Sequence, residues 1–467
     1  MIASRPLLIL TAAVLAAVTL TGIDRTGAAV ERNDFYLSNS GDDSADGRTP
    51  TTAWRTLDRL DHQPLRPGAR VLLDGGDTFA GTLRVGAGDA GDASRPVWIG
   101  SFGNGRAIIA AGGGPGVLIQ DTGGVRVGDL AITGGGGGTA DGVTVYTDRP
   151  GTRPSGILVE DLEVSGFRNG VSIGATCPDA GYHGVQVRKV VARDNRESGV
   201  ATYGPTFDAG RPVYVNTDIT VSEVVAFGNA GDPAAHVNTG NGIVLGSVSG
   251  GRVVGSVAYE NGAHSLAPEG PYGIWTYDST GVVIERNISH HNQTGAADGG
   301  GFDLDQNTSN CVLQHNLSYS NDGPGYLLFS NVANRANTGN VIRFNSSVDD
   351  GRRGDFYGGI TIMGGLSGPA SATGVFDAQV YGNTVTVCRS AAKTPPAVRI
   401  TGTLGGIMVH DNVFTARDDA ELVSAENFTM AGIMLRDNAY HSPSPVVGWA
   451  GGRFTTVADW HSATGQH

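Results

Sequence analysis

The chain has 467 residues, a formal net charge of −13 and a pI near 5.2. This acidic balance argues against a nucleic-acid partner, because phosphate binding requires clustered Lys and Arg, and the only lysines are Lys189 and Lys393. The three cysteines, Cys177, Cys311 and Cys388, allow at most one internal disulfide and exclude a disulfide scaffold. We expect most of them to be buried as small apolar side chains.

The N-terminus reads MIASRPLLILTAAVLAAVTLTG, one basic residue followed by an apolar run. The run is too short and too poorly flanked for a spanning helix and is typical of a secretory signal. Residues 1–29 are therefore predicted to be a signal peptide, with the mature chain beginning near Ala29. No later stretch is apolar enough to span a bilayer, so we expect an extracellular protein with no membrane partner.

Asparagine recurs at a near-constant interval through the second half of the chain, in segments such as VVIERNISHHN and VLQHNLSYSND. Between these segments, short apolar alternations and many of the 73 glycines indicate strands joined by turns. The first column of asparagines comprises Asn287, Asn316, Asn345, Asn383, Asn412 and Asn438. A second column comprises Asn195, Asn229, Asn261, Asn292 and Asn321.

A repeat of short strands buries its inward side chains only by stacking, which places the recurrent asparagines above one another in hydrogen-bonded ladders. The sequence therefore predicts an all-β fold, a parallel β-helix over residues 30–442 with turns of roughly 24–34 residues. The main alternative is a β-propeller, but its blades are longer and antiparallel. Residues 443–467 are predicted to form a tail that packs on or caps the helix.

A glycine followed by a short strand marks a further register: GVSIG, GVATY, GIVLG, GIWTY, GFDLD, GYLLF and GITIM. With period-2 geometry, the residue after the glycine faces the core and the next one faces outward. The predicted inward column is Val171, Val200, Ile243, Ile274, Phe302, Tyr326 and Ile360. The outward positions carry aromatic and apolar residues and two acids, among them Trp275, Tyr277, Asp303, Asp305, Leu327 and Phe329.

The chain resembles secreted right-handed parallel β-helix proteins of the pectate-lyase-like superfamily. Its opening FYLSNSGDDSADGRTPTTAWRTLDRL is similar to their entry region, and FTTVADWHSATGQH is similar to their exit segment. The resemblance implies a lyase, hydrolase or epimerase that acts on a polysaccharide along an outer strand face. The polygalacturonase pattern of NTD, paired Asp, GHG and RIK does not occur, so no catalytic residue is carried over from the superfamily.

The stretch GGGFDLDQN holds the acids Asp303 and Asp305 two positions apart, with Cα atoms expected roughly 6.6 Å from each other on one face. This spacing can suit the acid and base of an inverting glycoside hydrolase. The two side chains could also converge on one proton or on a calcium ion. The alternative is a pair of solvated acids on an exposed strand, although aspartate is disfavoured in strands.

Further candidates flank this pair. Glu269 is a second candidate acid, and a sugar platform is expected from Trp275 and Tyr277 on the neighbouring turn. Other candidate substrate-binding residues are Tyr272, Asp298 and Phe329. The adjacent His290 and His291 should point to opposite faces of a strand, which makes a zinc site improbable. Downstream, Arg335, Arg343, Arg352 and Arg353 could form a basic edge.

Three functions follow from these residues. The first is a secreted, monomeric glycoside hydrolase in which Asp303, Asp305 and Glu269 are catalytic. The second is a lyase or epimerase that acts on a uronic-acid polymer with calcium. The third is a non-catalytic glycan-binding or adhesion solenoid that uses Trp275 and Tyr277.

Overall fold

The computed structural model describes residues 33–89, 91–331, 335–354, 356–365, 373–390 and 394–467. The expected signal peptide, residues 1–29, lies outside them, as do the first residues of the expected β-helix domain. Nearly all regular structure in the compact unit Asn33–His467 is short parallel strand. Within the described residues, no helix has the length and apolar character needed to cross a membrane.

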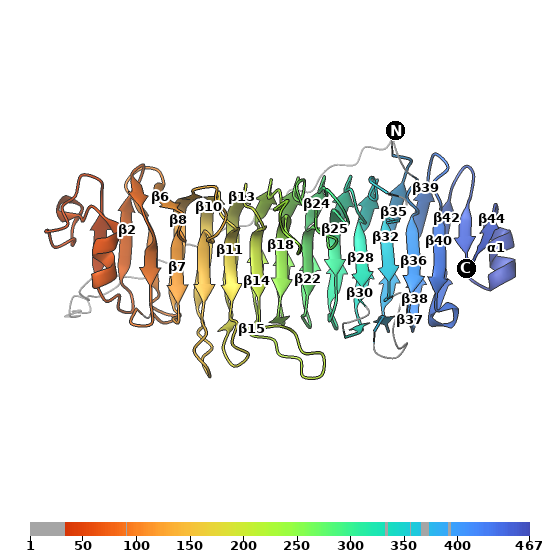
Figure 1. Ribbon diagram of the computed structural model, residues 1–467, viewed down its shortest axis with the longest axis horizontal. Helices are drawn as coiled ribbons and strands as arrows, with labels where there is room; N and C mark the ends of the chain where they lie inside the picture. The colour runs from red at the N-terminus through yellow and green to blue at the C-terminus, as the bar shows by residue number, and fades with distance from the viewer. Residues whose placement is uncertain (1–32, 90, 332–334, 355, 366–372, 391–393) are drawn as a thin grey trace, which may run out of the picture. The chain divides into compact units, whose positions relative to one another are not determined.

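One sheet of 14 strands follows the chain order, with one strand from each successive turn of the β-helix (Figure 1). Its strands pair in parallel, except for the last two, which are antiparallel. They are β4 (Leu83–Val85), β7 (Val117–Gln120), β9 (Val143–Tyr146), β11 (Asn169–Gly174), β14 (Ser198–Tyr203), β18 (Asn241–Gly246), β22 (Tyr272–Tyr277), β25 (Gly300–Leu304), β28 (Tyr326–Phe329), β32 (Ile360–Met363), β36 (Val398–Gly402), β40 (Val423–Phe428), β43 (Val447–Trp449) and β44 (Gly452–Phe454).

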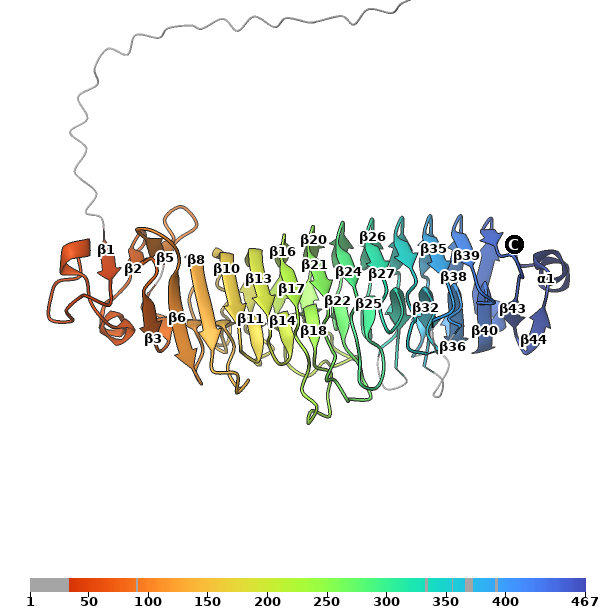
Figure 2. The ribbon, with the colours of Figure 1, turned by 90° about the horizontal axis from the view of Figure 1, so that it is seen from above.

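The other large sheet has 24 strands, usually two from each turn, and its strands stack in the same order (Figure 2). The first strands are β1 (Asp34–Leu37), β2 (Arg70–Asp74), β3 (Thr78–Ala80), β5 (Val97–Phe102), β6 (Ala107–Gly112), β8 (Val125–Gly134), β10 (Ile157–Ser165) and β13 (Gln186–Arg193). The later pairs are β16 (Thr220–Ser222) and β17 (Val225–Phe227), β20 (Arg252–Val254) and β21 (Val257–Tyr259), β23 (Val283–Glu285) and β24 (Ile288–His290), β26 (Val312–Gln314) and β27 (Leu317–Tyr319), β30 (Val341–Arg343) and β31 (Ser346–Val348), β34 (Gln379–Tyr381) and β35 (Thr384–Val387), β38 (Ile407–His410) and β39 (Val413–Ala416), β41 (Ile433–Arg436) and β42 (Ala439–His441).

The bend between the two strands of each pair explains the first asparagine column. A left-handed residue such as Arg286 (φ 55°) turns the chain, and the following Asn287 points inward. The backbone N–H and the Nδ2 of Asn287 both donate to Oδ1 of Asn316, over 3.0 and 3.1 Å. The same two bonds join Asn316 to Asn345, so the predicted ladder is confirmed.

The second asparagine column lies at the next bend and is also a ladder. Asn292 donates through its backbone N–H and its Nδ2 to Oδ1 of Asn321, over 2.9 Å in both bonds. One position beyond the predicted column, Asp350 takes the place of an asparagine. Its Oδ1 accepts from the backbone N–H and the Nδ2 of Asn321, over 3.0 and 2.8 Å, and its side chain is buried.

The predicted inward column is confirmed, because all seven residues from Val171 to Ile360 are fully buried in one continuous core. The glycine that precedes each inward residue is required by close packing. A Cβ at Gly273 would lie 2.0 Å from Oγ of Ser289, and one at Gly242 would lie 2.4 Å from the carbonyl oxygen of Gly273. This glycine column allows the strands to lie directly against the asparagine ladder.

The chain end covers the core of the last turns. After β44, helix α1 (Val457–Thr464) places Trp460 in the core with no exposed surface, 5.7 Å from the ring of Trp449. Smaller elements complete the fold. They are the three-stranded sheets β12 (Tyr182–His183), β15 (Asn216–Thr217), β19 (Val248–Ser249) and β29 (Asn337–Thr338), β33 (Val375–Phe376), β37 (Leu404–Gly405), and the 3₁₀ helices Pro50–Thr52, Leu57–His62 and Met430–Gly432.

Candidate active site

The outer face of the 14-stranded sheet has the register that the sequence predicts. Asp303 on β25 lies between Trp275 on β22 and Leu327 on β28, its direct neighbours on the two adjacent strands. Trp275 and Leu327 belong to an apolar cluster that is separate from the main core, and Tyr277 and Phe329 pack against this cluster. The period-2 argument therefore assigned the correct residues to the outside of the β-helix.

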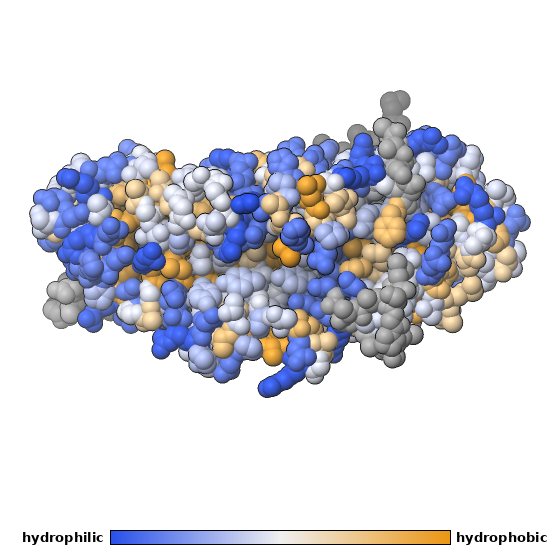
Figure 3. Space-filling model, in the orientation of Figure 1, coloured by the Kyte–Doolittle hydropathy of each residue, from blue (hydrophilic) through white to orange (hydrophobic). Residues whose placement is uncertain are grey.

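The alternative of two solvated acids on an exposed strand is wrong, because the floor of this face is recessed. Asp303 is only 1% exposed, and of the two rings expected to form a sugar platform Trp275 is only 6% exposed. The face lies in a cleft of about 920 Å³ lined by residues from β11 to β32. Six inter-strand spacings give this cleft a length of roughly 29 Å. Figure 3 shows the surface hollowed along the middle of the row.

One wall of the cleft consists of the connections that precede β18, β22, β25 and β32, and these connections contribute Asn238, Glu269, Asp298 and Tyr357. The longer connections project beyond the stacked strands (Figure 2). The carboxylate of Asp298 ties three of them together. It accepts hydrogen bonds from the backbone N–H of Gly270 over 2.8 Å, from the hydroxyl of Tyr272 over 3.3 Å, and from the hydroxyl of Tyr357.

Burial and mutual repulsion dominate the electrostatics of the acid pair. Burial raises the pKa of Asp303 well above its ordinary value, and the negative charges of Asp305 and Asp298 raise it further. Burial also raises the pKa of Asp305, and the acids Asp298 and Glu269 add to this effect. Two close carboxyls in such a site do not both ionise easily, so the pair retains a proton at neutral pH.

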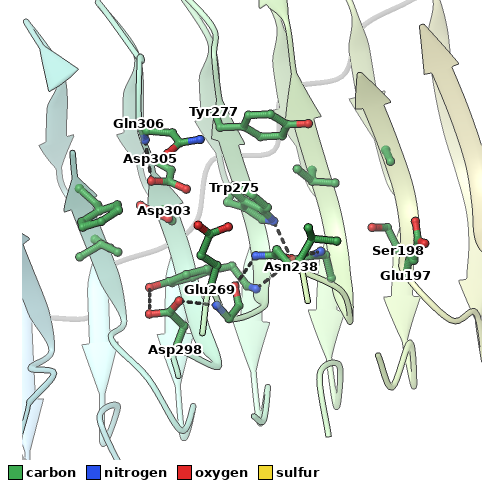
Figure 4. Close-up of a pocket in the computed structure, with 18 of the residues that line it drawn as sticks. Glu197, Ser198, Asn238, Glu269, Trp275, Tyr277, Asp298, Asp303, Asp305 and Gln306 are labelled. Carbon is green, nitrogen blue, oxygen red and sulfur yellow. Dashed lines mark hydrogen bonds between the residues drawn. The ribbon is translucent and has the colours of Figure 1, made fainter. Parts of the chain in front are cut away.

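The two carboxyls differ in their hydrogen bonds. Oδ1 of Asp303 is buried and has no hydrogen-bond partner among the described residues. Oδ1 of Asp305 accepts the backbone N–H of Gln306 over 2.6 Å, a bond that favours the ionised form. A buried polar atom without a partner costs free energy, so Asp303 has an unmet need for a hydrogen bond at the floor of the cleft. Figure 4 shows the two side chains close together, Asp303 on β25 and Asp305 directly after its last residue.

The aromatic floor is held by an amide network. Oδ1 of Asn241 accepts Nε1 of Trp275 over 2.9 Å and the backbone N–H of Tyr272 over 3.1 Å. Nδ2 of Asn241 donates to Oδ1 of Asn238 over 2.6 Å, and Asn238 in turn donates to the carbonyl of Gly270. This network fixes the indole of Trp275. It also fixes the connection before β22, in which Glu269 directly precedes Gly270 (Figure 4).

Glu269 is exposed on the wall, and its charge acts on both Asp298 and Asp305. Its carboxylate points back toward the acid pair (Figure 4). The far end of the cleft has a different polar group: Arg168 donates to both carboxylate oxygens of Asp141, over 2.9 and 2.8 Å, and its Nε lies 3.8 Å from Glu197.

No three His, Cys, Asp or Glu side chains among the described residues form a group that could hold a metal ion. The expectation that His290 and His291 point to opposite faces is wrong, since their Nδ1 atoms lie 2.9 Å apart. The strand ends at His290, and His291 adopts a left-handed φ of 53°, so the period-2 rule does not apply to this pair.

The four downstream arginines do not line the cleft. Arg343, for example, binds Oε1 of Gln314 through Nε over 2.9 Å and through Nη2 over 2.7 Å, on the other large sheet. All three cysteines are free. Cys311 is fully buried as expected, whereas Cys177 and Cys388 are only half-buried.

The sequence reading missed Asn241, Tyr357 and the Arg168–Glu197 end of the cleft. A signal for Asn241 existed, because polar residues precede the glycine in NGVSIG, SGVATY and NGIVLG, and these positions line the cleft as Asn169, Ser198 and Asn241. Tyr357 had no such signal, since it lies on an irregular connection before β32.

Comparison with known proteins identifies the fold and its relatives. A model of the right handed beta helix region matches residues 107–342, about half of the chain. No curated protein matches the chain.

Three solved structures illustrate the similarity. A GH136 lacto-N-biosidase from Eubacterium ramulus has 18% identity and a TM-score of 0.61 over 87% of this chain and 68% of its own. The A-module of a mannuronan C-5 epimerase from Azotobacter vinelandii has 16% identity and a TM-score of 0.53, over 80% and 90%. A mannuronic acid specific polysaccharide family 6 lyase from human gut microbiota has 13% identity and a TM-score of 0.54, over 88% and 86%.

At these identities the likeness concerns the fold, and the resemblance to the pectate-lyase-like superfamily is confirmed at that level. The chain belongs to the right-handed β-helix family.

Proposed function

We propose that the protein is a glycoside hydrolase that binds a glycan chain along the cleft and cleaves it at Asp303 and Asp305. The observation that carries this proposal is the buried, unpartnered Oδ1 of Asp303 at the floor of a long cleft, beside a second acid and two aromatic rings. Carbohydrate-active enzymes among the structural neighbours support a glycan as the substrate. The apolar N-terminus supports export of the enzyme.

The environments of the two acids assign their roles. Asp303 holds the proton and is the general acid, because it is the more buried acid and nothing in the described protein stabilises its anion. Asp305 is the general base, because the N–H of Gln306 stabilises its ionised form.

In the reaction, Asp303 gives its proton to the glycosidic oxygen as the bond from that oxygen to the anomeric carbon breaks. Asp305 takes a proton from the water that forms the new bond to the same carbon. Glu269 and the ring of Tyr277 contact the sugars, and Trp275 supports that ring from the floor of the cleft. Asp298 positions the wall of the cleft by accepting hydrogen bonds from Tyr272 and Gly270.

The test is a hydrolysis screen with the purified protein on neutral and acidic polysaccharides and oligosaccharides. Reducing ends are measured together with the ultraviolet absorbance of unsaturated products. We expect new reducing ends without that absorbance, and we expect Asp303→Asn to lower turnover by about 10²–10⁴-fold. Asp58→Asn, which changes an exposed aspartate outside the cleft, is the matched control.

Three outcomes would contradict the proposal. Unchanged turnover in both Asp303→Asn and Asp305→Asn would remove the acid pair from the mechanism. Unsaturated products would point to β-elimination, the reaction of a lyase, instead of hydrolysis. Glycan binding without turnover on any substrate would favour a binding solenoid.

A further inference from the structure

We infer that the cleft selects glycans without negative charge and rejects those that carry carboxylate or sulfate groups. The inference rests on the proposed function, since it names the substrate class of the same cleft. Its basis is the charge of the residues that line the cleft. Five acids line the cleft: Glu197, Glu269, Asp298, Asp303 and Asp305.

Arg168 is the one cation among the described residues that line the cleft. Its Nε and Nη2 donate to the two carboxylate oxygens of Asp141, over 2.9 and 2.8 Å, and Asp141 is only 4% exposed. Oε2 of Glu197 lies 3.8 Å from the same Nε. The charge of Arg168 is therefore balanced within the protein and is not available to a uronate.

The centre of the cleft is negative even with a proton on the acid pair. The carboxylate of Asp298 accepts three hydrogen bonds, and Glu269 faces the pair from the wall. A bound carboxylate or sulfate would add a like charge in a recessed site, where repulsion is screened less than at an open surface. A neutral sugar has no such cost, and its hydroxyls can donate to these acids.

Two observations besides the number of acids point to a ligand. Asp303 lines the cleft, and its buried Oδ1 has no partner among the described residues, an unmet need that a sugar hydroxyl or the glycosidic oxygen can satisfy when the carboxyl turns toward the cleft. The ring of Tyr277 stacks on the buried ring of Trp275, 5.1 Å away on the neighbouring outward position of β22, and its partly exposed face provides apolar surface for a pyranose.

Binding is tested with the Asp303→Asn variant, because an amide has the size and neutrality of the protonated carboxyl and turnover is suppressed. The probes are an array of neutral, carboxylated and sulfated oligosaccharides, followed by titration of the best neutral binder and of the same sugar with its primary hydroxyl oxidised to a carboxylate. We expect binding only to neutral glycans, and we expect the oxidised form to bind at least about 30-fold more weakly.

Two further measurements test the electrostatic cause. Raising the ionic strength from 0.1 to 1 M shortens the screening length from about 10 to about 3 Å, so the discrimination should shrink while the affinity for the neutral sugar stays nearly constant. Adding Glu269→Gln to the Asp303→Asn background should lower the discrimination several-fold, whereas adding Asp58→Asn should leave it unchanged.

The inference is overturned if a carboxylated or sulfated glycan binds as tightly as the neutral ones, if no neutral glycan binds, or if the discrimination does not respond to salt and to Glu269→Gln. Neutral binding without cleavage by the unsubstituted protein would remove the proposed hydrolase activity and leave the charge selection intact.

Discussion

Replacing Asp350 by asparagine should stabilise the protein, and the gain should grow with pH. Asp350 ends the second asparagine ladder, where its Oδ1 accepts both bonds from Asn321 and its Oδ2 is 2.7 Å from Oγ of Ser347. Asparagine keeps the Oδ1 acceptor and can donate from Nδ2 to the serine. The substitution therefore removes a buried charge and retains the ladder.

The magnitude follows from the pKa of Asp350, which burial raises from 3.8 to about 6. Because the folded-state pKa is above the unfolded-state value, the protonated acid favours the folded state. Its contribution is fully present below pH 3.8 and is lost as the pH rises through about 6. The shift corresponds to about 3 kcal/mol, of which about 2 kcal/mol should appear between pH 4 and pH 8.

The assay is chemical or thermal unfolding of the unsubstituted protein and of Asp350→Asn at pH 4 and pH 8, with Asp58→Asn as a control that removes the same formal charge from the surface. The stabilisation of Asp350→Asn relative to the unsubstituted protein should be about 2 kcal/mol larger at pH 8. An equal difference at both pH values, or one matched by Asp58→Asn, would refute the assignment of a costly buried charge at this position.

Three further predictions concern the ladder and the cleft. Asn316→Ala should destabilise the fold by about 3 kcal/mol, because it removes the acceptor of both bonds from the preceding rung and the donor of two more; a melting temperature like that of the exposed Asn104→Ala would contradict this. Asn241→Leu should leave the indole N–H of Trp275 without its partner, and we expect changed tryptophan fluorescence and a raised KM with folding retained; an unaltered KM would show that the network does not position the floor. Since burial raises the pKa of both carboxyls, to about 8 for Asp305, kcat/KM should fall on the acid side as the base Asp305 gains a proton and on the alkaline side as the acid Asp303 loses one; an acidic limb near the ordinary aspartate value of 3.8 would show that Asp305 is not the base.

Much of the fold could be predicted because its constraints repeat. An asparagine at each bend and a glycine before each inward residue recur from turn to turn. A single chain therefore shows the same hydrogen-bonding and packing requirements many times. The period-2 rule then assigned Phe302 to the core and Asp303 to the outside correctly. The rule failed at His291, where a left-handed residue ends the strand.

The depth of the site could not be predicted, because it depends on connections that do not repeat. Asp303 is on the outside of the β-helix, yet the walls bury it, and those walls are held by single contacts such as the bond from the hydroxyl of Tyr357 to Asp298. Contacts of this kind join residues that are far apart in the chain and follow no period. The polar residue that precedes the glycine, such as Asn241, was the one feature of the sequence that indicated the cleft.

The ladder of asparagines tolerates turns of unequal length. The step from Asn316 to Asn345 is 29 residues, whereas the step from Asn345 to Asn383 is 38, and the hydrogen bonds are the same in both. Insertions and deletions in the intervening connections therefore need not shift the phase of the strands. Changes in these connections can therefore remodel the rim of the cleft around Asp303 and Asp305 while β25 stays in register with its neighbours.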